Sequence, residues 1–188
     1  MRLKEIAAGD LKEDRDHPTI LYELLKSDLP PQEKSLDRLN EEAQLLVAAG
    51  LTTTAWTMTV TSFYVIQNPE IASKLHQELV AVLPDKDHPF SWQDVETLPY
   101  LNACIREGLR LAYGLTTRSP RRWPKPLEYN GWTIPARTPV SLSVIDHSHN
   151  EDIFPDSHSF RPERWLDGRL DKYFYSFGKG SRSCLGIK

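Results

Sequence analysis

The chain has little cysteine, little net charge and no apolar segment at its N-terminus. Two cysteines among 188 residues, Cys104 and Cys184, cannot form the disulfide framework of a small secreted protein, so a reducing compartment is favoured. The formal net charge of -3 gives no overall field that would attract nucleic acid or anionic lipid. The N-terminal sequence MRLKEIAAGDLKEDRD mixes both signs of charge, which is not typical of a signal peptide or a membrane anchor.

The first part of the chain is expected to be helical. Asp16-His17-Pro18 can open a helix over 19–26, where apolar residues recur at helical spacing. A long helix is predicted over 36–67, and it carries no charge from Ala43 to Asn68. That run is long enough for a membrane span, but six threonines between Thr52 and Thr61 make it too polar for hydrocarbon. We therefore expect a helix buried at the centre of a helical domain.

Capping signals place the next elements. Asn68-Pro69 opens a predicted helix that ends at Pro84, Ser91 and Asp94 resemble a capping box, and Pro99 opens a helix that continues to 112. Beyond it, short strands are predicted over 127–130, 132–135 and 140–145, followed by an irregular segment over 150–175. The predicted class is mainly α with a small β-sheet.

The most informative segment is 177–186, with the sequence FGKGSRSCLG. Glycines let backbone approach a flat ligand, because no Cβ intervenes. Arg182 offers a forked cation suited to a carboxylate, and Cys184 can supply a thiolate to a metal. A phosphate-binding Walker loop is excluded, because Tyr173 and Gly180 occupy its required glycine and hydroxyl positions. A phosphatase-type loop would need more residues and an arginine after its cysteine. The remaining alternative is a glycine-rich turn with a buried free cysteine.

This segment matches the F-x-x-G-x-R-x-C-x-G signature of the cytochrome P450 family at every fixed position, and the chain resembles that family. The resemblance implies that Cys184 is the axial ligand of the iron of haem b. It implies that Arg182 holds a haem propionate and that Phe177 shields the sulfur. The glycines of the loop would lie against the cofactor: Gly178, Gly180 and Gly186.

Two further motifs support the resemblance. Glu107 and Arg110 form an E-x-x-R pair, which local spacing alone would assign to a surface ion pair. In the family this pair binds a second arginine from a P-E-R-aromatic stretch, here Arg164 of 162–165. The resemblance therefore implies a structural triad without a chemical role.

The sequence AGLTTT at 49–54 places a glycine within the long helix, at a cost of about 1 kcal/mol relative to alanine. A neighbouring threonine hydroxyl can bond to a carbonyl one turn earlier and bend the helix. The resemblance implies that this interruption is the oxygen-binding kink and that Thr53 helps deliver protons. Thr52 stands where the family usually has an acid, so proton delivery by that route is expected to be poorer.

The segment 118–125 is the densest positive patch, and nucleic acid is a disfavoured partner for it because the chain as a whole is mildly acidic. The family pattern implies that Arg121, or else Arg118, binds a propionate, and that 115–117 face the substrate. His147, His149 and His158 could in principle hold zinc, but no further ligand stands at a familiar spacing. Cys104 is expected to be a packed helix residue.

The resemblance spans 16–188, and we expect 1–188 to be one partial domain, with a helical part over 16–112 and a sheet, meander and haem loop over 113–188. Family members are more than twice this length, so the chain is expected to correspond to an incomplete, C-terminal part of the fold. The texture is most similar to fungal members, many of which oxidise secondary metabolites. The implied function is a monooxygenase that uses O2, with electrons from NADPH through a reductase, on a small apolar substrate. The full-length protein would sit at the endoplasmic reticulum, whereas this chain shows no anchor. The alternative is a truncated product without productive haem binding.

Overall fold

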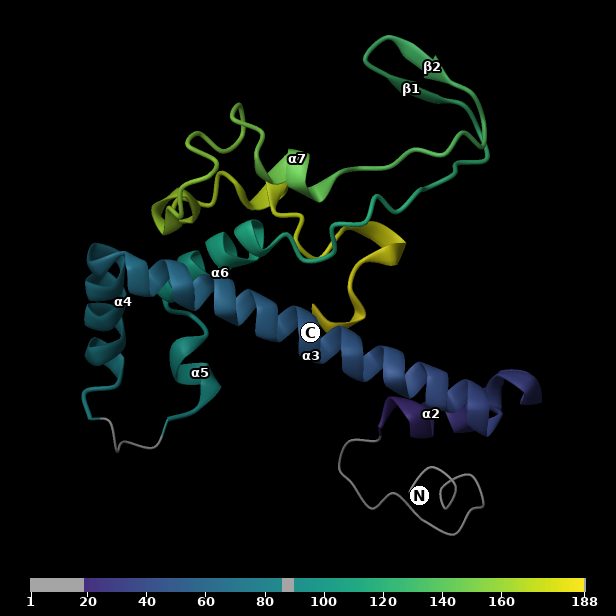
Figure 1. Cartoon of the computed structure of the whole chain (residues 1–188), viewed down its shortest axis with the longest axis horizontal. Helices are drawn as coiled ribbons and strands as arrows, with labels where there is room; N and C mark the ends of the chain where they lie inside the picture. Colours follow the sequence, from purple (N-terminus) through teal and green to yellow (C-terminus); the bar gives the residue numbers. More distant parts are fainter. Residues whose placement is uncertain (1–18, 86–89, 188) are drawn as a thin grey trace. The chain divides into compact units, whose positions relative to one another are not determined.

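The computed structural model describes residues 19–85 and 90–187, and the expected helix opening at 16–18 lies outside them (Figure 1). The chain divides into two compact units, Met1–Thr52 and Thr53–Lys188. In the first unit, α2 spans Ile20–Lys26, and the amide of Tyr22 donates to the side chain of its N-cap Thr19 at 3.3 Å. A short 3-10 helix, η1, covers Pro31–Lys34. The helix predicted over 19–26 is therefore confirmed by α2.

The long helix α3 spans Leu36–Gln67, as the sequence predicts. It runs through Gly50 without a break, so the expected interruption at 49–54 is not observed. The hydroxyls of Thr57, Thr59 and Thr61 donate to carbonyls four residues earlier at 2.8–2.9 Å, which satisfies these polar groups within the helix. Within the described ranges, no helix combines the length and hydropathy that a membrane span needs.

The expectation that α3 is buried on all sides is wrong for this chain. Val60, Tyr64 and Val65 pack against the core of the second unit. On other sides of the helix, Met58 is 65% exposed and Ile66 is 77% exposed. The physical reason is that packing in the second unit covers only one face of this helix.

Helix α4 spans Pro69–Val82, α5 spans Trp92–Val95 and α6 spans Pro99–Ala112. Glu78 of α4 accepts the backbone amides of Tyr100 and Leu101, both at 2.8 Å, and so satisfies two of the free donors at the start of α6. Buried apolar side chains from these helices and the later segment form one core cluster: Ile71, Tyr100, Cys104, Leu111 and Phe160.

Among residues 19–85 and 90–187, the sheet is one antiparallel hairpin of β1, Leu127–Tyr129, and β2, Trp132–Ile134, with Tyr129 opposite Trp132. Asn130 and Gly131 both have positive φ, as a two-residue hairpin turn requires. The strand predicted over 140–145 is wrong: Val140 makes one isolated bridge to Arg121, and Val144–Ser148 form the short helix α7. The reason is local, because Ser143 accepts the amide of Asp146 and caps a helix, whereas no strand among the described residues pairs with the segment.

The segment after α7 is mostly irregular, with short 3-10 helices η2, Pro162–Trp165, and η3, Asp171–Tyr173. A second core cluster anchors it, formed by Ala103 of α6 with Phe154 and Trp165. The chain is therefore mainly helical with a small sheet, and α6 supplies the surface on which the irregular segment is built.

Candidate functional site

A fully buried carboxylate lies at the centre of the second unit. Glu107 of α6 is 0% exposed, and five donors surround it. Its Oε1 accepts from Arg110 Nη2 at 2.7 Å, Arg164 Nε at 3.0 Å and the amide of Arg161 at 3.0 Å. Its Oε2 accepts from Arg110 Nε and from the indole of Trp165, both at 2.9 Å. This arrangement meets the requirement that a buried charge be paired and hydrogen-bonded.

The two guanidinium groups extend this network into the irregular segment. Arg110 Nη1 donates to the carbonyls of Ser148 and Ser157 at 2.7 Å, and Nη2 donates to Ser159 at 3.3 Å. Arg164 donates to the carbonyls of 155 and 156 at 3.1 and 3.4 Å. The structure thus brings the expected triad together, and each arginine binds backbone in addition to the carboxylate. Through these contacts the triad holds the backbone of the irregular segment against α6.

Burial sets the ionisation of two neighbouring groups. It lowers the pKa of Arg164, and the attraction of Glu107 opposes that shift. Burial raises the pKa of the Cys104 thiol to about 12, with nearby carboxylates adding to the shift. Cys104 is 1% exposed and therefore remains a packed thiol, not a ligand.

The second feature is the glycine-rich loop 177–186. Gly178 and Gly180 have φ of 69° and 78°, a region that side-chain-bearing residues rarely adopt. The amide of Cys184 donates to the carbonyl of Phe177 at 2.8 Å and closes the loop. Phe177 is half-buried, with its ring 6.1 Å from that of Phe174, whereas Cys184 is exposed. The backbone therefore presents a thiol at the surface with one aromatic anchored beside it.

The loop 177–186 offers one thiol as a metal ligand, which suits a metal whose other ligands belong to a bound cofactor. Within the described ranges, no group of three or more His, Cys, Asp or Glu residues is placed to hold a metal ion. Cys184 can act as one ligand of a centre whose other donors come from elsewhere, as in a porphyrin. A Cβ added at Gly180 would meet nothing within 4 Å, which leaves open space beside the loop. Gly186 lies next to the thiol, with an added Cβ 3.9 Å from its Sγ. The residues present therefore fit a haem, and Arg182 is exposed on the same loop.

Other predicted residues lie outside these two features. Thr52 and Thr53 are exposed on α3, and the boundary between the compact units falls between them. Arg121 is exposed, and its backbone pairs with Val140 at 2.7 and 2.9 Å. Arg118 makes an exposed ion pair with Asp146 at 3.5 Å. The segment 115–117 is exposed as well.

The histidines are engaged in hydrogen bonds and do not form a zinc cluster among the residues that the structure describes. His147 Nε2 lies 2.8 Å from the carbonyl of Tyr173. His149 bonds through Nε2 to the hydroxyl of Tyr113 at 2.7 Å and through Nδ1 to the Ser157 hydroxyl at 3.1 Å, and its ring stacks on His158 at 4.0 Å. Burial, the neighbouring His158 and Arg110 together lower the pKa of His149. His147 lies in α7, and His149 is the C-cap of that helix.

The sequence did not reveal several residues that stabilise the network around Glu107 and the helices beside it. Trp165 and Arg161 donate to Glu107, and Trp56 of α3 donates to the carbonyl of Ala112 at 3.1 Å. Glu163 accepts from Lys74 at 2.7 Å and from the Tyr100 hydroxyl at 3.0 Å. The aromatic position of the P-E-R-W stretch is the only sequence signal for any of these contacts, since the others depend on pairing between distant segments.

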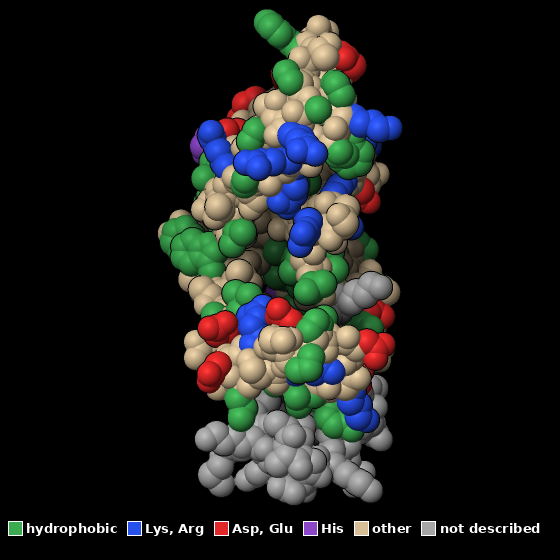
Figure 2. Space-filling model, turned by 90° about the vertical axis from the view of Figure 1, so that its right-hand side faces the viewer, with side chains coloured by type: hydrophobic (Ala, Val, Ile, Leu, Met, Phe, Trp, Pro, Cys, Tyr) green, Lys and Arg blue, Asp and Glu red, His purple; other side chains and the backbone are tan. Residues whose placement is uncertain are grey.

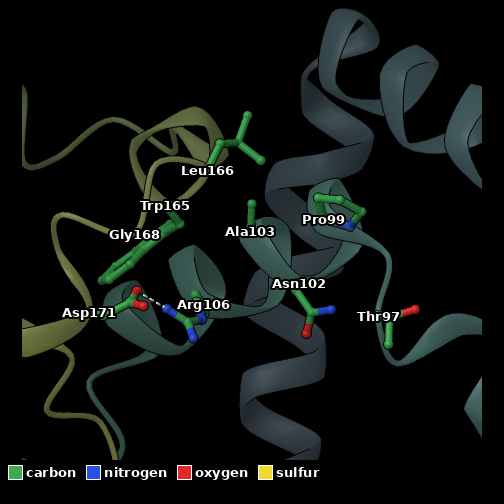
Figure 3. A pocket seen from close by; sticks show the side chains of 9 residues that line it. All are labelled: Thr97, Pro99, Asn102, Ala103, Arg106, Trp165, Leu166, Gly168 and Asp171. Carbon is green, nitrogen blue, oxygen red and sulfur yellow. Dashed lines mark hydrogen bonds and ion pairs between the residues drawn. The ribbon is translucent and has the colours of Figure 1, made fainter.

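A pocket of about 320 Å³ lies between the start of α6 and η2 (Figure 3). Arg106 points toward Asp171, with which it forms an ion pair, and it lies 5.9 Å from the ring of Trp165. The loop that carries Cys184 contributes nothing to this pocket. Its lining consists of Thr97, Pro99, Asn102, Ala103, Arg106, Trp165, Leu166, Gly168 and Asp171.

Comparison with known proteins connects these features. The sequence profile of the family "Cytochrome P450" matches residues 3–188. The chain is 45% identical over 180 residues to the cytochrome P450 monooxygenase sdnE of Sordaria araneosa, covering 91% of this chain and 35% of the relative. It is 46% identical over 175 residues to the cytochrome P450 monooxygenase MO6277 of Ascocoryne sarcoides, covering 90% and 34%. It is 43% identical over 182 residues to the cytochrome P450 monooxygenase tpcC of Cochliobolus heterostrophus, covering 93% and 35%. The chain thus spans only about a third of the length of these relatives.

Proposed function

The chain belongs to the cytochrome P450 family, and on that premise we propose that it forms the haem-binding part of a haem-thiolate monooxygenase. The reaction inserts one oxygen atom of O2 into a small apolar substrate, with electrons from NADPH through a reductase. The three relatives are named monooxygenases and come from fungi, which supports this reaction type and a substrate drawn from fungal secondary metabolism. The assembled enzyme would work at the cytosolic face of the endoplasmic reticulum.

The observation that carries the proposal is the exposed thiol of Cys184 on a closed, glycine-dependent loop. Haem would supply the iron at which O2 is reduced and cleaved, and electron donation from a thiolate ligand favours that cleavage. Cys184 would be that ligand. Phe177 would exclude water from the sulfur, because it is half-buried against Phe174 beside the loop.

Two exposed cations would bind the cofactor. Arg182 and Arg121 would each hold one propionate, since a guanidinium group matches a carboxylate with two parallel hydrogen bonds. Gly178, Gly180 and Gly186 would permit close approach of the macrocycle to the backbone. The triad of Glu107, Arg110 and Arg164 would keep the irregular segment that precedes the loop in place.

Thr53 would hold a proton donor near the oxygen. A hydroxyl can both donate and accept, so it can position a water molecule and pass on a proton from it. Thr52 replaces the carboxylate that could restore the proton at neutral pH, and the supply is therefore slower than with an acid. A protein that binds haem but releases much of its reducing power as peroxide is the second candidate function, and Thr52 is the residue that favours it.

The test is the spectrum of the purified 188-residue chain after incubation with haem. Reduction under carbon monoxide should give the red-shifted Soret band of a thiolate ligand, and Cys184→Ser should remove it. Cys104→Ala is the matched control, because it removes the other, buried thiol and should leave the band unchanged. A band that survives in Cys184→Ser, or that never forms in the wild type at saturating haem, would refute the assignment. In the loaded protein with a reductase, Thr53→Ala should keep the band and raise peroxide yield; an unchanged yield would contradict the role of Thr53.

A further inference from the structure

The end of α6 and the two residues after it form a junction between several segments of the second unit. Ala112 ends α6 and is 2% exposed, and Tyr113 and Gly114 follow it with positive φ of 61° and 54°. A left-handed conformation after the last turn is a common way for a helix to end. The exposed segment 115–117, which is expected to face the substrate, comes directly next. We refer to residues 112–114 as the α6 junction.

Trp56 of α3 binds the α6 junction through one hydrogen bond. Its indole Nε1 donates to the carbonyl of Ala112 at 3.1 Å, across 56 residues of sequence. A carbonyl in the last turn of a helix has no partner within that helix, so the indole satisfies a group that α6 cannot satisfy itself. A tryptophan side chain is large and rigid, and its N–H gives the contact a defined direction. The hydrogen bond therefore fixes this part of α3 against the end of α6.

The hydrogen bond, and not packing, is the specific contribution of Trp56. Its side chain is 53% exposed, and hydrophobic side chains are exposed at other places as well, as the green surface of Figure 2 shows. The core engages α3 further along, where Val60, Tyr64 and Val65 pack against it. There the ring of Tyr64 stacks on that of Phe160, with centroids 5.1 Å apart. Loss of the indole N–H should therefore change the place of α3 at Trp56 without unfolding the core.

The indole contact lies one helical turn from Thr53. Residues three apart on a helix are neighbours on its surface, so Thr53 and Trp56 share one side of α3. The carbonyl of Thr53 accepts the hydroxyl of Thr57 at 2.9 Å, and α3 is continuous through this stretch. Whatever fixes the ring of Trp56 therefore also fixes the rotation of the turn that carries Thr53.

The α6 junction also lies against the segment that leads into the glycine-rich loop. A Cβ added at Gly114 would be 3.4 Å from the carbonyl of Ser176, one residue before Phe177. The hydroxyl of Tyr113 lies 2.7 Å from Nε2 of His149. The junction thus contacts α3, the irregular segment and the residue that precedes the loop.

We propose that Trp56 is a positioning residue for oxygen activation. Its indole holds the turn that carries Thr53 in a fixed place relative to the α6 junction, and through Gly114 relative to the loop that carries Cys184. This inference rests on the proposed function, in which Thr53 helps to deliver protons and Cys184 binds the iron. Trp56 acts through Thr53 and touches neither cofactor nor substrate. The alternative is a cap that only stabilises the end of α6.

The first measurement is amide hydrogen exchange on the haem-free 188-residue chain, followed by mass spectrometry. Trp56→Phe keeps an aromatic ring and removes the N–H that binds the carbonyl of Ala112. Exchange over 109–117 should rise by about two- to tenfold, as one neutral hydrogen bond implies, while exchange over α4 stays unchanged. Trp92→Phe is the matched control, because Trp92 is 64% exposed and lies in α5, and it should leave exchange over 109–117 unchanged. Unchanged exchange over 109–117 in Trp56→Phe would overturn the inference.

The second measurement is the peroxide yield of the chain loaded with haem and supplied with a reductase and NADPH. Trp56→Phe should keep the thiolate Soret band and raise the peroxide yield, as Thr53→Ala does. The double variant should release no more peroxide than Thr53→Ala alone, because a residue that acts through the Thr53 hydroxyl has no effect once that hydroxyl is absent. Trp92→Phe should give the wild-type yield.

The peroxide measurement separates the failure of this inference from the failure of the proposed function. If Thr53→Ala raises the yield and Trp56→Phe leaves it at the wild-type value, Trp56 is only a cap and the inference alone is wrong. If the effects of the two substitutions multiply in the double variant, Trp56 acts independently of Thr53 and the inference is again wrong. If Thr53→Ala itself leaves the yield unchanged, the proposed role of Thr53 fails and the inference fails with it.

Discussion

Replacing Glu107 by alanine should be among the most destabilising single changes in this chain. The substitution leaves five donors without their acceptor, from Arg110, Arg161, Arg164 and Trp165. The side chains of Arg110 and Arg164 are 3% and 7% exposed, so water cannot replace the carboxylate without opening the structure. Each guanidinium would then be a buried charge without its counter-ion.

The size of the loss in free energy of unfolding follows from the burial of Glu107 and its partners. Removing one partner of a buried ion pair costs about 3–5 kcal/mol, whereas an exposed pair contributes about 0–1 kcal/mol. Domains are stable by about 5–15 kcal/mol, so Glu107→Ala removes a large share of the free energy of unfolding. With a urea dependence of about 2 kcal/mol per molar, the unfolding midpoint should fall by about 2 M. Glu107→Gln should lose nearly as much, because either orientation of the amide turns a donor toward other donors.

The measurement is urea unfolding followed by circular dichroism, compared with Glu33→Ala as control. Glu33 pairs with Arg38 at 3.2 Å, with both side chains at least 40% exposed, and its loss should move the midpoint little. If Glu107→Ala and Glu33→Ala shift the midpoint equally, the buried network does not stabilise the fold and the reasoning fails.

Two further predictions concern packing and pH. Gly108→Ala should destabilise the chain, since the added Cβ would lie 1.8 Å from Thr61 Oγ1. Gly50→Ala should instead stabilise the chain by about 1 kcal/mol, because nothing lies within 4 Å of the added Cβ. Equal urea midpoints for the two variants would contradict this prediction. Because the pKa of His149 is lowered in the folded chain, the unfolded chain binds the proton more readily. The free energy of unfolding is therefore highest above the ordinary histidine pKa of about 6.5, and it declines as pH falls through the lowered value. His149→Gln should flatten that decline between neutral and acid pH, and His76→Gln, an exposed control, should not; a decline of the same slope in all three proteins would refute the assignment.

Local signals predict the helices well. Thr19 and Pro69 stand at the start of helices where the sequence places them, and the bounds of α3 match the uncharged run and its flanks. Capping and proline act within a few residues, so one sequence contains the information. The segment 140–145 shows the limit of such signals. Its alternating pattern indicates a strand, but a strand needs a partner, and here Ser143 caps a helix instead.

The candidate site likewise contains some residues that the sequence identifies and others that it does not. The loop around Cys184 is contiguous, so its glycines and its thiol can be identified from the sequence alone. The burial of Glu107 cannot be derived from its spacing to Arg110, because the burial depends on Arg164 and Trp165, whose hydrogen bonds span 57 and 58 residues. Only the resemblance to a family links the E-x-x-R and P-E-R-W stretches at the level of sequence. The cap that Glu78 supplies to α6 has no sequence signal at all.

The way in which Arg110 and Arg164 bind the irregular segment has a consequence for sequence divergence. Between them, the two guanidinium groups bind the main-chain carbonyls of residues 148, 155, 156, 157 and 159, and the carbonyl of any amino acid can accept such a bond. The shape of this stretch is therefore specified largely by residues outside it. Substitutions at exposed positions such as Ser159 should be tolerated, whereas conservative changes at either arginine should not. A library randomised over the exposed positions of this stretch should yield many folded members, and inserted residues that move the carbonyls out of reach should yield few.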